Sequence, residues 1–389
     1  MSTAVAHREE GGERTLARTA LGEAIGLPEN EDGWIVFRDA VADLEYLRSC
    51  VDLRSEGLNL ELGAYRLHCF LDFREVRGDD RHPYHQLATQ LDGRGVPSID
   101  EALGQLILSP VLEPIRRLLG EPVLLGLSST DGFGEAGAAL LRSAGTEVGA
   151  YLEAAAHRAE AEVGRAEVER LIVADLEAVR AVVEVLRGPE EEDGPIARMT
   201  RHLVEGFAEP GFWATVLVWI LIRRLGVLTE PENARELARG WLDTWYVGST
   251  LADLLTDLGM TREAARRHVT AVKLMIAGAG WDKRAEDAAS GLRDVVVEAI
   301  SDPEGQQFLG VHRHDDVRWF NREAFEELAR WLMVTAAVDS VTGDGAASET
   351  AVVELDRTIE PLLAIAERGG YRVKALLEAI QSQKDPQRR

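Results

Sequence analysis

Two short clusters of histidines and carboxylates contain the side chains of this sequence that could do chemistry. In the segment 310–321, His312 and His314 are followed directly by Asp315 and a second aspartate. Imidazole and carboxylate groups bind transition metals and exchange protons. On an extended loop the two imidazoles point the same way, but the sequence nearby offers no cysteine or further histidine as a third ligand. The alternative to a metal site is a loop that leads into the next helix.

The second cluster consists of His82 and His85, which follow Asp79 and Asp80. Histidines three residues apart meet on one face of a helix, and Pro83 is compatible with the first turn of a helix. This cluster could bind a metal or transfer a proton. The alternative is an exposed entry to a helix.

One hypothesis joins the two clusters into an enzyme or a metal-binding protein, whose site forms where segments 79–85 and 312–316 meet. The candidate metal ligands are then His82, His85, His312, His314 and Asp315. Such a site requires the two segments to lie close in space. No catalytic residue is assigned and no cofactor is predicted.

Segment 251–269 shows two helical patterns separated by a turn at Gly259, and the second pattern carries several arginines. This arrangement has some similarity to a helix-turn-helix and is a further, less favoured hypothesis for nucleic-acid binding. The formal net charge of the whole chain is -24, which repels phosphates and anionic membrane surfaces. We therefore predict neither a nucleic-acid partner nor a membrane partner.

Helical periodicity dominates the elements that would position these side chains. Apolar residues recur every two to four positions over 34–54, and a second helical pattern covers 59–77. Ser98 stands three residues before Glu101, a spacing typical of a helix N-terminus. Further helices are predicted over 196–208, 211–226, 231–257, 261–278, 281–300, 321–339 and 348–382. The predicted fold class is all-α, a multi-helix bundle.

The longest periodic segment, 134–186, predicts either one very long helix or a helical hairpin near the middle of the chain. Gly149 and Gly164 are the residues that could interrupt it, because glycine in a helix interior costs about 1 kcal/mol relative to alanine.

Composition divides the chain into two helical units. Residues 1–30 are polar and predict a flexible N-terminal arm. The stretch 188–195 is dense in proline, glycine and acidic residues, which is typical of a linker. It separates an N-terminal helical unit over 31–187 from a C-terminal helical bundle over 196–382. A polar tail over 383–389 follows.

The apolar residues predict a substantial core, since they make up 46% of 389 residues. The most apolar run, 214–222, is shorter than the roughly 20 residues that cross a bilayer and is predicted to be a buried helix segment. Trp219, Trp241 and Trp331 lie on apolar helical faces and are predicted to pack in the core. The N-terminus lacks the apolar stretch of a signal peptide, so the protein is expected in the cytoplasm, with both cysteines reduced.

Three stretches resemble one protein family. The sequences YRLHCFLDFREV (65–76) and LDGRGVPSIDEAL (91–103) resemble a helical region that follows the catalytic barrel in large bacterial α-amylase-family proteins. The stretch 308–331, with FLGVH and WFN, is similar to a later block of the same region. The family's barrel enzymes use an Asp nucleophile two residues after an Arg, a Glu acid and a third Asp. This sequence lacks that set and has too few predicted strands for an eight-stranded barrel.

These observations together predict a non-catalytic helical interaction or accessory protein, which the resemblance associates with α-glucan metabolism. Its helical faces would bind a protein partner or a second copy of the chain through an apolar patch with an arginine-rich rim. An α-glucan is the ligand that the resemblance implies.

Overall fold

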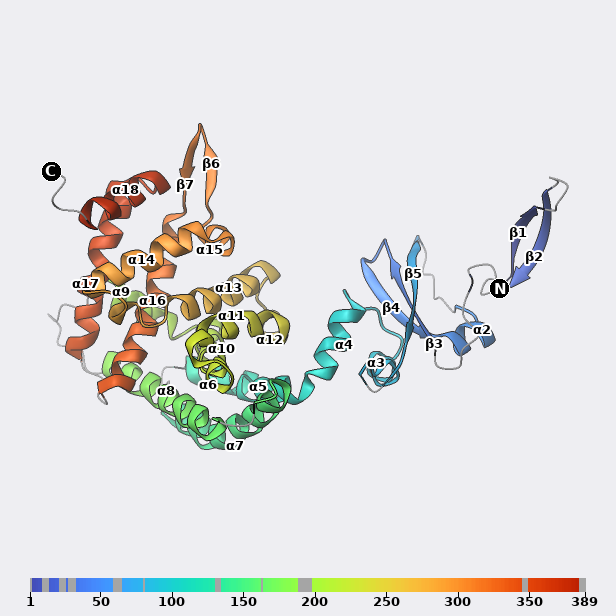
Figure 1. Ribbon diagram of the computed structural model, residues 1–389, viewed down its shortest axis with the longest axis horizontal. Helices are drawn as coiled ribbons and strands as arrows, with labels where there is room; N and C mark the ends of the chain where they lie inside the picture. The colour runs from blue at the N-terminus through green and yellow to red at the C-terminus, as the bar shows by residue number, and fades with distance from the viewer. Residues whose placement is uncertain are drawn as a thin grey trace. The chain divides into compact units, whose positions relative to one another are not determined.

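The chain divides into two compact units, Met1–Ser109 (unit 1) and Pro110–Arg389 (unit 2). The computed structural model describes residues 2–8, 14–20, 26, 33–58, 65–79, 81–129, 134–161, 164–187, 198–344 and 349–384. Most of these residues are helical (Figure 1), so the prediction of a mostly helical chain is confirmed. The all-α class is too narrow, however, because unit 1 contains β-strands.

In its described residues, unit 1 combines two small antiparallel sheets with three helices. Its elements are β1 (Ser2–Arg8), β2 (Arg14–Ala20), β3 (Gly33–Asp39), β4 (Leu44–Ser49), α2 (Cys50–Ser55), β5 (Phe70–Arg77), α3 (Tyr84–Leu91) and α4 (Ile99–Ile107). Strands β1 and β2 form an antiparallel hairpin within residues 1–30, where a flexible arm was predicted. Strands β3, β4 and β5 form an antiparallel sheet in the order β4-β3-β5.

The predicted helix over 34–54 is wrong, because these residues form β3, β4 and α2. After Gly33, the central strand β3 continues with Trp34 and three further aromatic or β-branched residues, a run that suits a strand covered on both faces. Val36 packs on one face with residues of α3 and α4, whereas Ile35 and Phe37 pack on the other face. The apolar residues at the start of the predicted helix therefore belong to a strand that is buried on both faces.

The predicted helix over 59–77 is also wrong where the structure describes it, because Phe70–Arg77 is the edge strand β5. Asp72 has a positive φ of 56°, and the pairing of β3 with β5 shifts register between Val36 and Arg38. This irregularity is typical of a β-bulge in an edge strand. The predicted helix start at Ser98 is confirmed, since its side chain accepts a hydrogen bond from the Glu101 N–H at 3.2 Å.

Unit 2 is built from α-helices, three short 3-10 helices and one small hairpin. Its elements are α5 (Ser109–Leu118), α6 (Glu121–Ser128), α7 (Glu135–Arg158), α8 (Arg165–Leu186), α9 (Arg198–Gly206), α10 (Pro210–Arg223), η1 (Leu225–Leu228), η2 (Pro231–Asn233), α11 (Ala234–Thr244), α12 (Val247–Asp257), α13 (Arg262–Gly278), η3 (Trp281–Lys283), α14 (Ala288–Ser301), α15 (Pro303–Phe308), β6 (His312–His314), β7 (Val317–Trp319), α16 (Arg322–Asp344), α17 (Glu349–Arg368) and α18 (Val373–Lys384).

The periodic segment 134–186 is a pair of packed helices, α7 and α8, and not one very long helix. Gly164 adopts a positive φ of 97° directly before α8. That conformation is readily available to glycine. Gly149 lies within α7 and does not interrupt it.

Helix α10 lies at the centre of unit 2 and contacts α6, α8, α11, α12 and α13. The segment Pro210–Leu228 is long and apolar enough to cross a membrane, but 89% of its apolar window is buried inside the unit. Since its neighbours already cover it, α10 has the surroundings of a core helix, and the prediction of a buried helix over 214–222 is confirmed.

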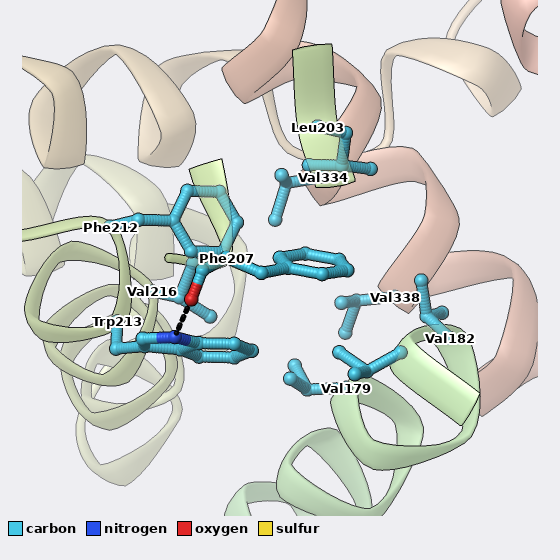
Figure 2. Close-up of a pocket in the computed structure, with 10 residues that line it drawn as sticks. Val179, Val182, Leu203, Phe207, Phe212, Trp213, Val216, Val334 and Val338 are labelled. Carbon is cyan, nitrogen blue, oxygen red and sulfur yellow. Dashed lines mark hydrogen bonds between the residues drawn. The ribbon is translucent and has the colours of Figure 1, made fainter. Parts of the chain in front are cut away.

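A small void lies where α8, α9, α10 and α16 meet. Its volume is about 20 Å³, and its lining is entirely apolar, with Phe207, Trp213 and Val338 among the residues shown in Figure 2. The indole N–H of Trp213 is engaged, because Nε1 donates to the Phe207 carbonyl at 2.9 Å. A void of this size without polar partners is a packing gap and no ligand site.

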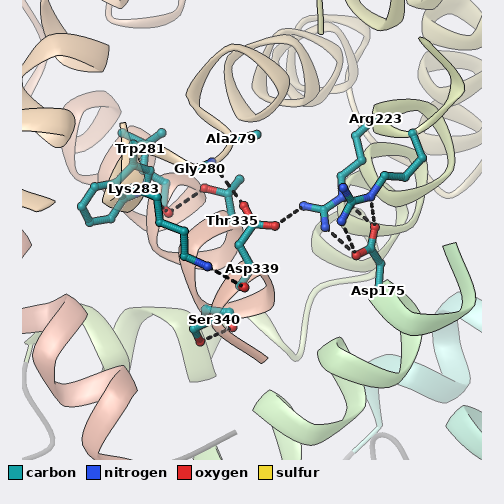
Figure 3. A network of polar contacts seen from close by, with 12 residues as sticks. Asp175, Arg223, Ala279, Gly280, Trp281, Lys283, Thr335, Asp339 and Ser340 are labelled. Atoms are coloured by element: carbon teal, nitrogen blue, oxygen red, sulfur yellow. Dashed lines mark hydrogen bonds and ion pairs between the residues drawn. The ribbon is translucent and has the colours of Figure 1, made fainter. Parts of the chain in front are cut away.

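A buried ionic network ties the helices of unit 2 together (Figure 3). Asp175 of α8 is fully buried and accepts two hydrogen bonds from Arg223 at 2.5 and 2.7 Å and two from Arg224 at 2.9 Å. Arg223 also donates to Asp339 of α16 at 2.9 Å, and the other Asp339 oxygen accepts from the Gly280 N–H at 3.2 Å. Although burial alone would raise the pKa of Asp175, the two guanidinium groups hold it below its ordinary value.

The compact units divide at Ser109–Pro110, and the ionic network joins helices from both sides of the predicted linker within unit 2. Helix α8 precedes the segment 188–195, whereas α10 and α16 follow it, and the three helices share one core. The linker itself lies outside the described residues, as do residues 385–389 of the predicted tail. The predicted units 31–187 and 196–382 therefore differ from the observed ones.

Candidate functional site

The cluster around His82 and His85 lines a recess in the surface of unit 1. The recess has a volume of about 250 Å³ and is lined by Trp34, Gly78, Asp79, His82, Pro83, Tyr84 and His85. Trp34 belongs to β3, and the other lining residues follow β5 and enter α3. Two backbone hydrogen bonds between Asp79 and His82 close the loop that carries them. Both histidines thus belong to one site.

A carboxylate and an imidazole are paired in this recess. Nδ1 of His82 lies 2.9 Å from Oδ1 of Asp79, which also accepts hydrogen bonds from the backbone N–H groups of Arg81 and His82. The hydrogen bond with the His82 ring is the main reason why the pKa of Asp79 is lowered. Such a pair can orient an imidazole and exchange a proton. Both side chains are more than half exposed, however, so water reaches them freely.

The cluster around His312 and His314 forms the hairpin β6–β7, which projects from the helices of unit 2 (Figure 1). Asp315 and Asp316 occupy its turn with positive φ values of 47° and 62°. The side chains of both histidines and both aspartates are exposed. Nε2 of His314 lies 3.4 Å from a carboxylate oxygen of Asp315.

The alternative interpretation of this segment, in which a loop ends at an N-cap residue of the next helix, is confirmed at Asn321. The side chain of Asn321 accepts a hydrogen bond from the Ala324 N–H at 2.8 Å, at the start of α16. Asparagine at this position satisfies a backbone donor of the first helical turn.

The two histidine clusters belong to different units, His82 and His85 to unit 1 and His312 and His314 to unit 2. Within the part of the chain that the structure describes, no group of three or more His, Cys, Asp or Glu side chains is placed to hold a metal ion. Neither unit contains both segments, so the joint site of segments 79–85 and 312–316 is not supported by the geometry of either unit.

Segment 251–269 does contain two packed helices, α12 and α13. Two basic side chains of α13 are used inside unit 2. Arg267 donates to Glu327 at 2.7 Å, and Nδ1 of His268 lies 2.8 Å from the Thr215 hydroxyl. Burial lowers the pKa of His268 to about 4, so this ring is neutral near pH 7.

Large apolar side chains remain exposed chiefly in unit 1. Among the described residues, six of the eight such side chains lie between positions 41 and 73. They are Val41, Val51, Tyr65, Leu67, Leu71 and Phe73. Single exposed apolar side chains need no explanation, but a concentration of them in one unit marks a candidate interaction surface.

Four of these side chains lie on the edge strand β5 or in the segments next to its start, and we call them together the β5 surface (Val41, Leu67, Leu71 and Phe73). Val41 lies in the turn after β3, and Leu67 shortly precedes β5. Leu71 pairs with a residue near the end of β3, and the Phe73 ring stacks on Phe37 at 5.2 Å. The β5 surface therefore belongs to the edge strand and to the turn beside it.

A buried carboxylate fixes the start of β5. The side chain of Asp39 is fully buried, and its Oδ2 lies 2.5 Å from Nδ1 of His68. Its Oδ1 accepts hydrogen bonds from the backbone N–H groups of Val41 at 3.0 Å and Cys69 at 3.3 Å. The hydrogen bond with His68, supported by these backbone donors, lowers the pKa of Asp39 to about 2. Asp39 thus holds the β3–β4 turn against the start of β5.

Sequence reasoning missed both the β5 surface and the Asp39–His68 pair, because it assigned residues 59–77 to a helix. The signal that could have found them is the composition of β3, which is rich in aromatic and β-branched residues, together with Phe70, Phe73 and Val76 in β5. Leu71 and Phe73 lie on either side of Asp72 in the edge strand β5. This arrangement becomes apparent only when residues 70–77 are assigned to a strand.

Comparison of the chain with models of protein families, with curated proteins and with solved structures found no match.

Proposed function

We propose that this chain is a non-catalytic interaction protein that binds a partner protein through the β5 surface. The observation that carries the proposal is the exposure of large apolar side chains on the edge strand β5 and next to its start, including Leu67 and Leu71, which are 69% and 48% exposed. Burying such side chains against a partner contributes favourable free energy in proportion to the apolar area removed from water. Unit 2 supplies a separate helical body with its own core.

The partner is a different protein and not a second copy of this chain. A second copy would carry the same formal net charge of -24, and like charges oppose close approach. A partner surface that combines apolar side chains with a basic rim complements both the exposed apolar side chains and the negative charge of this chain.

Binding uses side chains more than the backbone of the edge strand. The positive φ of Asp72 disrupts the regular geometry of β5, and charged side chains such as Arg74 and Glu75 follow it. Bulges and charges are the devices by which edge strands resist the addition of a further strand. Contacts to Leu67, Leu71 and the Val41 turn therefore carry the interaction.

We also propose that the chain is associated with α-glucan metabolism and that an α-glucan is a second ligand. The resemblance of residues 65–76, 91–103 and 308–331 to the α-amylase-family region supports this. The stretch 65–76 contains both Leu67 and Leu71. A glucan that bound there would compete with the partner protein. Adding soluble α-glucan to the binding assay tests this directly.

The experiment compares capture of partner proteins from native lysate by the full-length chain and by two variants. Leu71→Asp places a charge in the β5 surface, whereas Leu125→Asp does the same on α6 of unit 2, where Leu125 is 49% exposed. The proposal expects a protein that the wild type and Leu125→Asp capture equally and that Leu71→Asp loses by about ten-fold or more, the scale of an interface hot spot. Equal recovery with all three chains, or no capture by the wild type, would refute it.

A further inference from the structure

A second recess lies on unit 2, beside a tryptophan that the sequence placed in the core. Trp219 and Trp331 are fully buried as predicted, but Trp241 of α11 is partly exposed. It lines a recess of about 460 Å³, which we call the α11 recess. The lining residues are Glu230, Asn233, Glu236, Leu237, Gly240, Trp241 and Thr244. This volume is within the range of small-molecule sites.

The Trp241 ring is held in a fixed orientation. It stacks on the buried ring of Trp245 with a centroid distance of 4.5 Å and an angle of 13° between the planes. Beside it, Gly240 leaves open space, because a Cβ at that position would meet no atom within 4 Å. The recess therefore presents a pre-organised aromatic side chain next to an unfilled position on the helix surface.

The charged side chains that line the recess are both carboxylates. Neither Glu230 nor Glu236 lies within ion-pair distance of a basic side chain in the described part of the chain. The amide of Asn233 donates to one Glu230 oxygen at 2.8 Å and so orients this carboxylate. Arg239 lies on α11 together with Glu236, but it donates hydrogen bonds to Asp302 and Glu304 and so does not neutralise the carboxylates of the recess.

We propose that the α11 recess binds a small organic cation, an alkylammonium group that lies against the Trp241 ring and is paired with Glu230 and Glu236. Tryptophan offers the most favourable aromatic face for a cation, and two unpaired carboxylates leave a charge that a neutral ligand would not compensate. The net charge of -24 also raises the local concentration of cations around the whole chain. The side chains on the recess are exposed, so binding is weak to moderate and weakens with salt.

The test is a titration of the full-length chain with tetramethylammonium chloride, with sodium chloride at equal ionic strength as the reference. Incorporation of 5-fluorotryptophan gives one fluorine resonance for each of the eight tryptophans, and the variant Trp241→Phe assigns that of Trp241. The proposal expects the Trp241 resonance to shift in a saturable way with tetramethylammonium and not with sodium.

Variants then locate the site through line broadening of the tetramethylammonium methyl resonance. The proposal expects Trp241→Leu to weaken binding about ten-fold and Glu236→Gln about three-fold, the range of a cation–π contact and of an exposed ion pair. Glu232→Gln, an exposed carboxylate of η2 outside the lining, should leave binding unchanged. Far-UV circular dichroism verifies that each variant folds.

Three results would overturn the proposal: no saturable shift of the Trp241 resonance, equal weakening by Glu232→Gln and Glu236→Gln, or saturable binding of neutral maltotriose with no response to tetramethylammonium. The third result would identify the recess as a carbohydrate site.

Discussion

Replacing Asp175 with asparagine should strongly destabilise unit 2. The wild-type carboxylate has no exposed surface and accepts four hydrogen bonds from Arg223 and Arg224. Removing one partner of a buried ion pair typically costs about 3–5 kcal/mol, because the opposite charge stays buried without compensation. Arg223 keeps its contact with Asp339, and Arg224 is 26% exposed to water. Both facts favour the lower end, a loss of about 3 kcal/mol in the free energy of unfolding.

Urea unfolding monitored by tryptophan fluorescence measures this loss. Seven of the eight tryptophans belong to unit 2, and Trp34 is the one that does not, so fluorescence reports mainly on the unit that contains the network. Glu184→Gln is the matched control, because Glu184 also lies on α8 and pairs with Arg180 at 2.8 Å at an exposed position. Exposed pairs at this spacing contribute about 0.3–0.5 kcal/mol. If the two variants lost similar free energy, the ionic network would not hold the helices as described.

Three further outcomes follow from individual contacts. The Asp39 carboxyl, with its pKa lowered to about 2, stabilises the folded chain above the ordinary carboxyl pKa, and this contribution is lost as the pH falls toward 2. The difference in unfolding free energy between the wild type and His68→Ala should therefore shrink from pH 5 to pH 2 in denaturant titrations, and a difference independent of pH would contradict the pairing. Gly291→Ala should lower the thermal midpoint strongly, since a Cβ there would lie 1.8 Å from the Trp281 carbonyl oxygen. Gly149→Ala within α7, where a Cβ meets no atom within 4 Å, should instead stabilise the chain by about 0.5–1 kcal/mol, and a calorimetric scan that ranked the two variants equally would refute this packing.

Helical periodicity predicted the helices of unit 2 because their buried apolar residues recur at helical spacing, as in α8, or form one continuous apolar run, as in α10. The apolar run in α10, the break near Gly164 and the cap at Asn321 are local signals, and the structure contains all three features. Periodicity failed at Tyr246, whose positive φ of 57° separates α11 from α12 within the predicted helix 231–257. A tyrosine gives no warning of such a break, because this conformation is rare for its residue type.

Unit 1 was harder to predict because its central strand β3 is buried on both faces. Trp34, Ile35, Val36 and Phe37 are consecutive apolar residues, so they show no alternation with a period of two, and later apolar residues completed a false helical spacing. Reading this run by its β-branched and aromatic composition would have favoured a strand.

The candidate sites depended on contacts that no local pattern reveals. His82 and His85 both line one recess, but His82 precedes α3, which begins at Tyr84, so the two rings do not share a helix face as their spacing predicted. The Asp39–His68 pair joins residues 29 positions apart, and the partial exposure of Trp241 depends on how α11 packs, so neither could be read from spacing.

The most direct test of the proposed function is hydrogen exchange measured by mass spectrometry on the full-length chain, with and without the captured partner. The proposal expects slower exchange in peptides that cover β5 and the β3–β4 turn, and no change in α6, where Leu125 provides the exposed reference. Protection confined to unit 2, with exchange across residues 40–43 and 65–77 unchanged, would contradict the claim that the β5 surface binds the partner.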